Sequence, residues 1–125
     1  MKKALLGIAL VGLLSVRAST ALADHVCAVT YDPPTSNLGS SGGVSLTLFT
    51  GVKCTGSQTG IKRFCSSGAT NTGCAAGVTL ALNTLLQIYA TAADSITSGL
   101  SASGQVATCI GGGSGCWSNI SFIGN

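Results

Sequence analysis

Acidic residues and histidine are scarce in this sequence. There is no glutamate, the aspartates are Asp24, Asp32 and Asp94, and His25 is the one histidine. Hydrolases that use a nucleophile, a base and an orienting group, or two carboxylates across a cleft, depend on these residue types. Asp24 and His25 lie next to the expected mature N-terminus, and the other two aspartates suit a turn and a helix end. We therefore expect no enzymatic activity.

Closely spaced metal ligands and nucleotide-binding motifs are also missing. No two cysteines stand at the short spacing that zinc sites usually use, and no Cys-x-x-Cys motif suggests an oxidoreductase. The glycine-rich run at residues 111–115 lacks the Lys-Ser/Thr of a P-loop. It also has Cys116 where the last glycine of the dinucleotide fingerprint belongs. We expect no metal and no cofactor.

Long apolar runs are missing after the N-terminal segment, and none approaches the ~20 residues that a membrane span needs. The chain begins with Lys2 and Lys3, continues with a short apolar run at residues 4–16, and reaches small residues at Ala23. This pattern is typical of a secretory signal peptide. We predict cleavage after Ala23, so that 1–23 is the signal peptide. An uncleaved N-terminal anchor is the alternative.

Residues 24–125 are then expected to form a single domain, secreted or periplasmic, with no membrane span. Removal of the leader leaves three cations against three aspartates. The remaining cations are Lys53, Lys62 and Arg63. Nucleic-acid binders present a basic surface or groove, which this balance does not provide. We therefore expect no nucleic-acid partner. The short lysine-led signal favours a bacterial source.

Cysteine is abundant in the mature part. An even number of cysteines in a small exported domain is typical of a disulfide framework. Cys109 and Cys116 flank a glycine-rich loop between two strand-like segments, and facing residues of an antiparallel pair are close enough for a disulfide. We predict a Cys109–Cys116 disulfide. The sequence leaves the pairing of the other four open: Cys27, Cys54, Cys65 and Cys74.

The hydrophobic pattern predicts a β-β-β-α-β-β order, mainly β with one helix. The expected strands are residues 25–32, 44–54, 61–65, 105–110 and 116–123. The helix is expected at residues 78–95, where apolar side chains recur at steps of three and four. We expect this stripe to face the core: Val78, Leu82, Leu85, Leu86, Tyr89 and Ala93.

The helix segment LALNTLLQIYATAADS precedes the strand segments QVATCI and CWSNISFIG. In this order, and in size, leader and cysteine use, the chain resembles small exported bacterial OB-fold-like proteins, including B subunits of AB5 toxins. The resemblance implies a small five-stranded barrel, binding through loops and one sheet face, and allows a homo-oligomer. A disulfide-stapled open antiparallel sheet is the alternative fold.

The expected function is that of an exported, non-catalytic binding module for a glycan or a protein surface. Trp117, Asn119 and Ser121 would share one face of the last strand, with Ile120 and Phe122 on the other. An exposed indole beside an amide and a hydroxyl would suit a sugar. In the alternative interpretation, Trp117 closes the edge of the core. A secreted effector or antimicrobial protein and a structural envelope protein remain as other functions.

Overall fold

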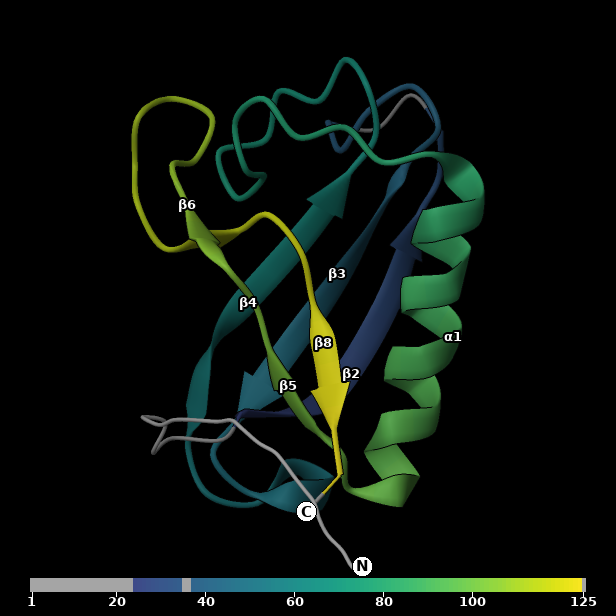
Figure 1. Cartoon of the computed structure of the whole chain (residues 1–125), viewed down its shortest axis with the longest axis vertical. Coiled ribbons are helices and arrows are strands. Elements are labelled where there is room, and N and C mark those ends of the chain that lie inside the picture. The colour runs from purple at the N-terminus through teal and green to yellow at the C-terminus, as the bar shows by residue number, and fades with distance from the viewer. Residues whose placement is uncertain (1–23, 35–36, 125) are drawn as a thin grey trace, which may run out of the picture.

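The computed structural model describes residues 24–34 and 37–124, so the predicted signal peptide at 1–23 lies outside the described residues. The fold is mostly β with one helix, as predicted, and Figure 1 shows its arrangement. In chain order the elements are β2 (Asp24–Asp32), β3 (Gly43–Phe49), the 3-10 turn η2 (Val52–Cys54), β4 (Gln58–Cys65), α1 (Leu82–Ser98), β5 (Ser101–Ser103), β6 (Val106–Ala107), β7 (Cys116–Trp117) and β8 (Ser121–Ile123).

The strands form an antiparallel sheet with the order β4-β3-β2-β5-β8, and β6 pairs with β7 in a separate small sheet. The sheet is not closed into a barrel, so the open-sheet alternative is the one that the structure adopts. The predicted last strand, residues 116–123, is divided. Its first part, β7, pairs with β6, whereas its last part, β8, pairs with β5.

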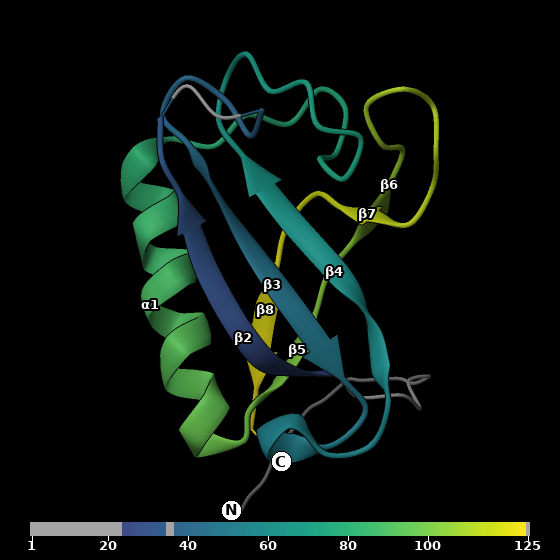
Figure 2. The ribbon, with the colours of Figure 1, turned by 180° about the vertical axis from the view of Figure 1, so that it is seen from behind.

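One face of the central strands carries the main core. Val26, Leu46 and Phe64 are almost fully buried there, and α1 packs against β2 and β3 on this side. β5 and β8 lie in front of β2 and β3 in Figure 1 and enclose the same core. Figure 2 looks onto the opposite face of β2, β3 and β4, which no helix covers in this view. We call this opposite face the open face.

A bulge in β2 decides which of its side chains reach the open face. The pairing of β2 with β3 shifts between Val26 and Ala28, so that Cys27 is the extra residue. Val26 belongs to the core, and beyond the bulge Val29 and Tyr31 pack against the core in their turn. The alternate residues of β2, which are Ala28, Thr30 and Asp32, therefore point to the open face.

The helix begins and ends later than predicted, and its core stripe is different. The side chains buried along α1 are Leu85, Ile88, Ala92 and Ser95. Of the predicted stripe, Leu85 is buried, whereas Leu82, Leu86 and Tyr89 are 46%, 47% and 37% exposed and Ala93 is also exposed. Val78 precedes the helix and packs on another cluster, with Ala75 and the Cys109–Cys116 pair.

The stripe prediction failed because two of the buried positions do not look like core residues. Ala92 is small and lets α1 approach the sheet. Ser95 buries a hydroxyl, which donates to the Ala92 carbonyl oxygen at 2.7 Å and so keeps a hydrogen bond in the core. Larger side chains at Leu86 and Tyr89 dominated the sequence pattern although they lie on the solvent side of the helix.

Three disulfides connect the elements. Cys27–Cys54 joins the β2 bulge to η2, Cys65–Cys74 joins the end of β4 to the following loop, and Cys109–Cys116 closes the glycine-rich loop between β6 and β7. The last pairing is the one that the sequence predicts. Disulfides are typical of proteins in oxidising compartments. Among the described residues, no helix is long and apolar enough to cross a membrane.

Gly104 separates β5 from β6. A Cβ atom at Gly104 would lie 2.5 Å from Cε3 of Trp117 and equally close to the Asn119 carbonyl oxygen. We expect Gly104→Ala to displace the indole ring and to lower the free energy of unfolding by about 1–3 kcal/mol. Urea denaturation followed by fluorescence of Trp117, the only tryptophan, measures this.

Gly113→Ala is the matched control for this prediction. A Cβ at Gly113 would meet the Cys109 Cβ at 3.8 Å, an ordinary contact. Equal unfolding midpoints for the two variants would contradict the proposed close approach of the Gly104 backbone to Trp117.

Candidate functional site

Trp117 is not the exposed platform that one interpretation of the sequence suggested. Its side chain is 8% exposed and belongs to the main core, and the Lys62 Nζ lies 5.2 Å from the ring centroid. The Lys62 ammonium also donates to the Gly115 carbonyl oxygen at 2.6 Å, which fixes it beside the ring. The indole therefore belongs to the main core and not to an exposed surface.

Asn119 and Ser121 remain exposed but lie on different structural units. The Asn119 side chain accepts a hydrogen bond from the Gln105 backbone N–H at 3.0 Å and donates to the Gln105 Oε1 at 3.3 Å. It thus holds the chain between β7 and β8 against the start of β6. Ser121 lies in β8, opposite Ser103. The structure does not combine them with Trp117 into one exposed surface.

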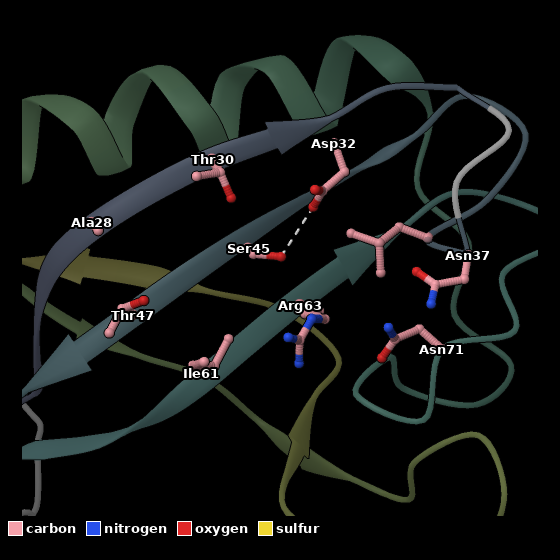
Figure 3. A pocket seen from close by; sticks show the side chains of 10 residues that line it. Ala28, Thr30, Asp32, Asn37, Ser45, Thr47, Ile61, Arg63 and Asn71 are labelled. Carbon is pink, nitrogen blue, oxygen red and sulfur yellow. Dashed lines mark hydrogen bonds between the residues drawn. The ribbon is translucent and has the colours of Figure 1, made fainter.

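A hollow of about 350 Å³ lies on the open face instead. We call it the open-face hollow, and Figure 3 shows its lining. Its floor comes from β2, β3 and β4, and its end comes from the segments around Asn37 and Asn71. Its lining residues are Ala28, Thr30, Asp32, Asn37, Leu38, Ser45, Thr47, Ile61, Arg63 and Asn71.

The floor of the hollow follows from the strand register. Ser45 in β3 is paired with Thr30 in β2 and with Arg63 in β4, so these residues form one row across the sheet. Thr47 is the centre of the neighbouring row, between Ala28 and Ile61. Side chains at such positions share one face of the sheet. Small side chains in β2 and β3 leave the space that longer ones would fill.

Opposite charges line the same hollow without forming an ion pair. The Ser45 hydroxyl donates to the Asp32 Oδ2 at 3.2 Å, as drawn in Figure 3. The Arg63 guanidinium makes no hydrogen bond or ion pair with any described residue. It lies beside the loop that bears Asn71, because a Cβ at Gly73 would come within 2.8 Å of the Arg63 Nη1. None of its five N–H donors is used by a residue that the structure describes.

Two amides complete one end of the hollow, where Figure 3 shows Asn37 and Asn71 near each other. The Asn71 Oδ1 accepts from the Gly73 N–H at 2.7 Å, which orients this amide and leaves its NH₂ group able to donate. The Asn37 carbonyl oxygen accepts from the N–H groups of Thr70 and Asn71 at 3.0 and 2.9 Å. These backbone bonds hold the two loops together.

No histidine is among the described residues that line the hollow. His25 lies at the other end of β2 from Asp32, roughly 23 Å away at ~3.3 Å per residue. It is buried, with its Nδ1 3.3 Å from the Leu100 carbonyl oxygen. No group of three potential metal ligands occurs in residues 24–34 and 37–124. Carboxylate, guanidinium, amide and hydroxyl groups together form a polar surface in the hollow.

Comparison with protein-family models, with curated proteins and with solved structures gives no match for this chain.

Proposed function

We propose that this protein is an exported, non-catalytic binding module that binds a glycan in the open-face hollow. The observation that carries the proposal is the gathering of polar side chains with free hydrogen-bonding capacity in one hollow on an uncovered sheet face. Thr30, Thr47 and Arg63 have no side-chain hydrogen bond to any described residue. Its volume of about 350 Å³ falls in the range of small-molecule sites.

The mixture of groups in the hollow suits a sugar. Sugar hydroxyls act as both donors and acceptors, and Asp32 accepts while Asn71 donates. Ile61, which is 43% exposed, adds apolar surface to the hollow, against which the C–H groups of a sugar ring can pack. The rigid floor keeps these groups in place, so that binding orders few side chains.

Export and the lack of catalysis belong to the same proposal. The leader at residues 1–23 and three disulfides both favour an oxidising compartment outside the cytoplasm. The Ser45 hydroxyl beside Asp32 has no imidazole near it, so nothing in the hollow activates it as a nucleophile. A bound sugar would be held and not cleaved.

A bulky side chain in the hollow tests this proposal. Thr30 is exposed in the floor, so Thr30→Trp should fill the hollow without disturbing the core on the opposite face. We expect the labelled mature chain to bind at least one class of glycan on a glycan array. Thr30→Trp should weaken that binding at least about tenfold, an amount typical of losing a few ligand contacts.

Thr91→Trp provides the control, because Thr91 is exposed on α1 and does not line the hollow. It should bind like the unmodified chain. An array without any bound glycan, or equal binding by both variants, would contradict the proposal. Attention would then turn to a secreted effector or to an envelope protein without a small ligand.

A further inference from the structure

We infer that the open-face hollow selects an acidic saccharide, in which the carboxylate of a uronic or sialic acid pairs with Arg63. The inference rests on the proposed function, since it names the class of glycan for the same hollow. It follows from the lack of a partner for Arg63 among the described residues, from the position of Asp32 and from the other polar groups that line the hollow.

Arg63 is the one cation among the described residues that line the hollow. The other described cations are placed elsewhere: Lys62 is held by the Gly115 carbonyl oxygen and the Trp117 ring, and Lys53 is exposed in η2. Arg63 is partly buried and still has no partner among the described residues. A partly desolvated guanidinium without a partner gains from an anion, and its planar fork matches a carboxylate in two parallel hydrogen bonds.

Asp32 makes a simple anion a poor match for the whole hollow. Its carboxylate accepts one hydrogen bond from the Ser45 hydroxyl and none from any other residue that the structure describes. A second ligand anion placed there would be repelled, whereas a sugar hydroxyl would donate to it. The hollow therefore suits a ligand that has a carboxylate at one side and hydroxyls at the other.

The spacing of these groups is set by the sheet. Arg63 and Thr30 lie one strand to either side of Ser45. Neighbouring strands are ~4.8 Å apart, so the backbones of Arg63 and Thr30 are separated by roughly 10 Å. The amides of Asn37 and Asn71 extend the polar surface beyond that row. These groups exceed what a small inorganic ion can use, and a saccharide with several hydroxyls would use them.

The test compares acids with their own methyl esters, which differ by the charge and little else. Galacturonic, glucuronic and N-acetylneuraminic acid, as short oligosaccharides, are titrated into the mature oxidised chain in a calorimeter. We expect at least one acid to bind about tenfold or more tightly than its ester, as for loss of a charge-assisted pair. Added salt should weaken binding of the acid more than that of the ester.

Arg63→Gln should remove the preference for the acid, and Arg63→Lys should retain only part of it, because an ammonium lacks the fork. Lys53→Gln removes the same charge from η2, outside the hollow, and should leave the preference unchanged. Thermal melting of each variant checks that the chain is folded before titration.

The outcomes separate this inference from the proposal beneath it. Equal affinity for acids and esters, or an unchanged preference in Arg63→Gln, would overturn the acidic-saccharide inference. Binding of neutral glycans that Thr30→Trp abolishes would also overturn the acidic-saccharide inference. It would leave the hollow as a glycan site. Failure of every acidic and neutral saccharide to bind at millimolar concentration would overturn both.

Discussion

Reduction of the three disulfides is expected to bring this protein to the edge of unfolding at room temperature. The bridges close loops with sequence separations of 27, 9 and 7 residues. In the chain-entropy model these loops stabilise the fold by about 3.6, 2.6 and 2.4 kcal/mol. A small domain has a total free energy of unfolding of only about 5–15 kcal/mol. The cross-links therefore supply a large part of the stability.

The three contributions should add, because the loops follow one another along the chain and none lies inside another. Their sum is roughly 8.5 kcal/mol in the same model. The core is modest by comparison, and many residues lie in loops that only cross-links and backbone hydrogen bonds hold. A chain of this size would be marginal without such cross-links.

Urea denaturation followed by circular dichroism, with and without a reducing agent, measures the effect. Paired serine variants resolve it: replacing Cys27 and Cys54 should cost about 1 kcal/mol more than replacing Cys109 and Cys116, because the closed loop is longer. If reduction left the unfolding midpoint unchanged, the bridges could not have the stabilising role assigned to them.

The same cross-links bear on the candidate site. Cys65–Cys74 lies beside Leu38 in a small cluster of its own, between the end of β4 and the loop that carries Asn71. Loss of this bridge should loosen the end of the hollow before the main core is affected. Function and redox state are therefore expected to be linked through the two loops that bring Asn37 and Asn71 together.

The sequence was sufficient for the order of long elements and for one disulfide. Turn-forming segments and alternating patterns indicated β2, β3 and β4, and the Cys109–Cys116 pairing followed from two strand-like segments around glycines. The short strands were harder. β5 consists of Ser101–Ser103 and has no apolar alternation. It pairs with β2 through the backbone, and no side-chain pattern in the sequence indicates this pairing.

The sequence did not predict the open-face hollow, because a single bulge in β2 changes which face of the sheet the following side chains point to. Without the extra residue at Cys27, strict alternation would place Val26, Ala28 and Thr30 on one face. With it, Val26 joins the core while Ala28 and Thr30 reach the open face. The aromatic content of the last segment instead directed attention to Trp117, which the close approach of Gly104 turns into the core.

The helix gives the sharpest test of packing, because two consecutive leucines have opposite environments. Leu85 is fully buried, whereas Leu86 is 47% exposed. Leu85→Ala should lower the free energy of unfolding by about 2–5 kcal/mol through lost burial and a cavity against the sheet. Leu86→Ala should change it by less than about 0.5 kcal/mol, since alanine favours a helix and little apolar surface is lost.

The measurement is urea denaturation of the two variants side by side. Both variants truncate a leucine to alanine, at adjacent positions of the helix. The result assigns the rotation of α1 on the sheet. Comparable losses in both variants would mean that Leu86 is covered in solution, by a second copy of the chain for example. A large loss in Leu86→Ala alone would contradict the rotation of α1 that buries Leu85. A loss confined to Leu85→Ala fixes the helix on the core face and leaves the open face free for a ligand.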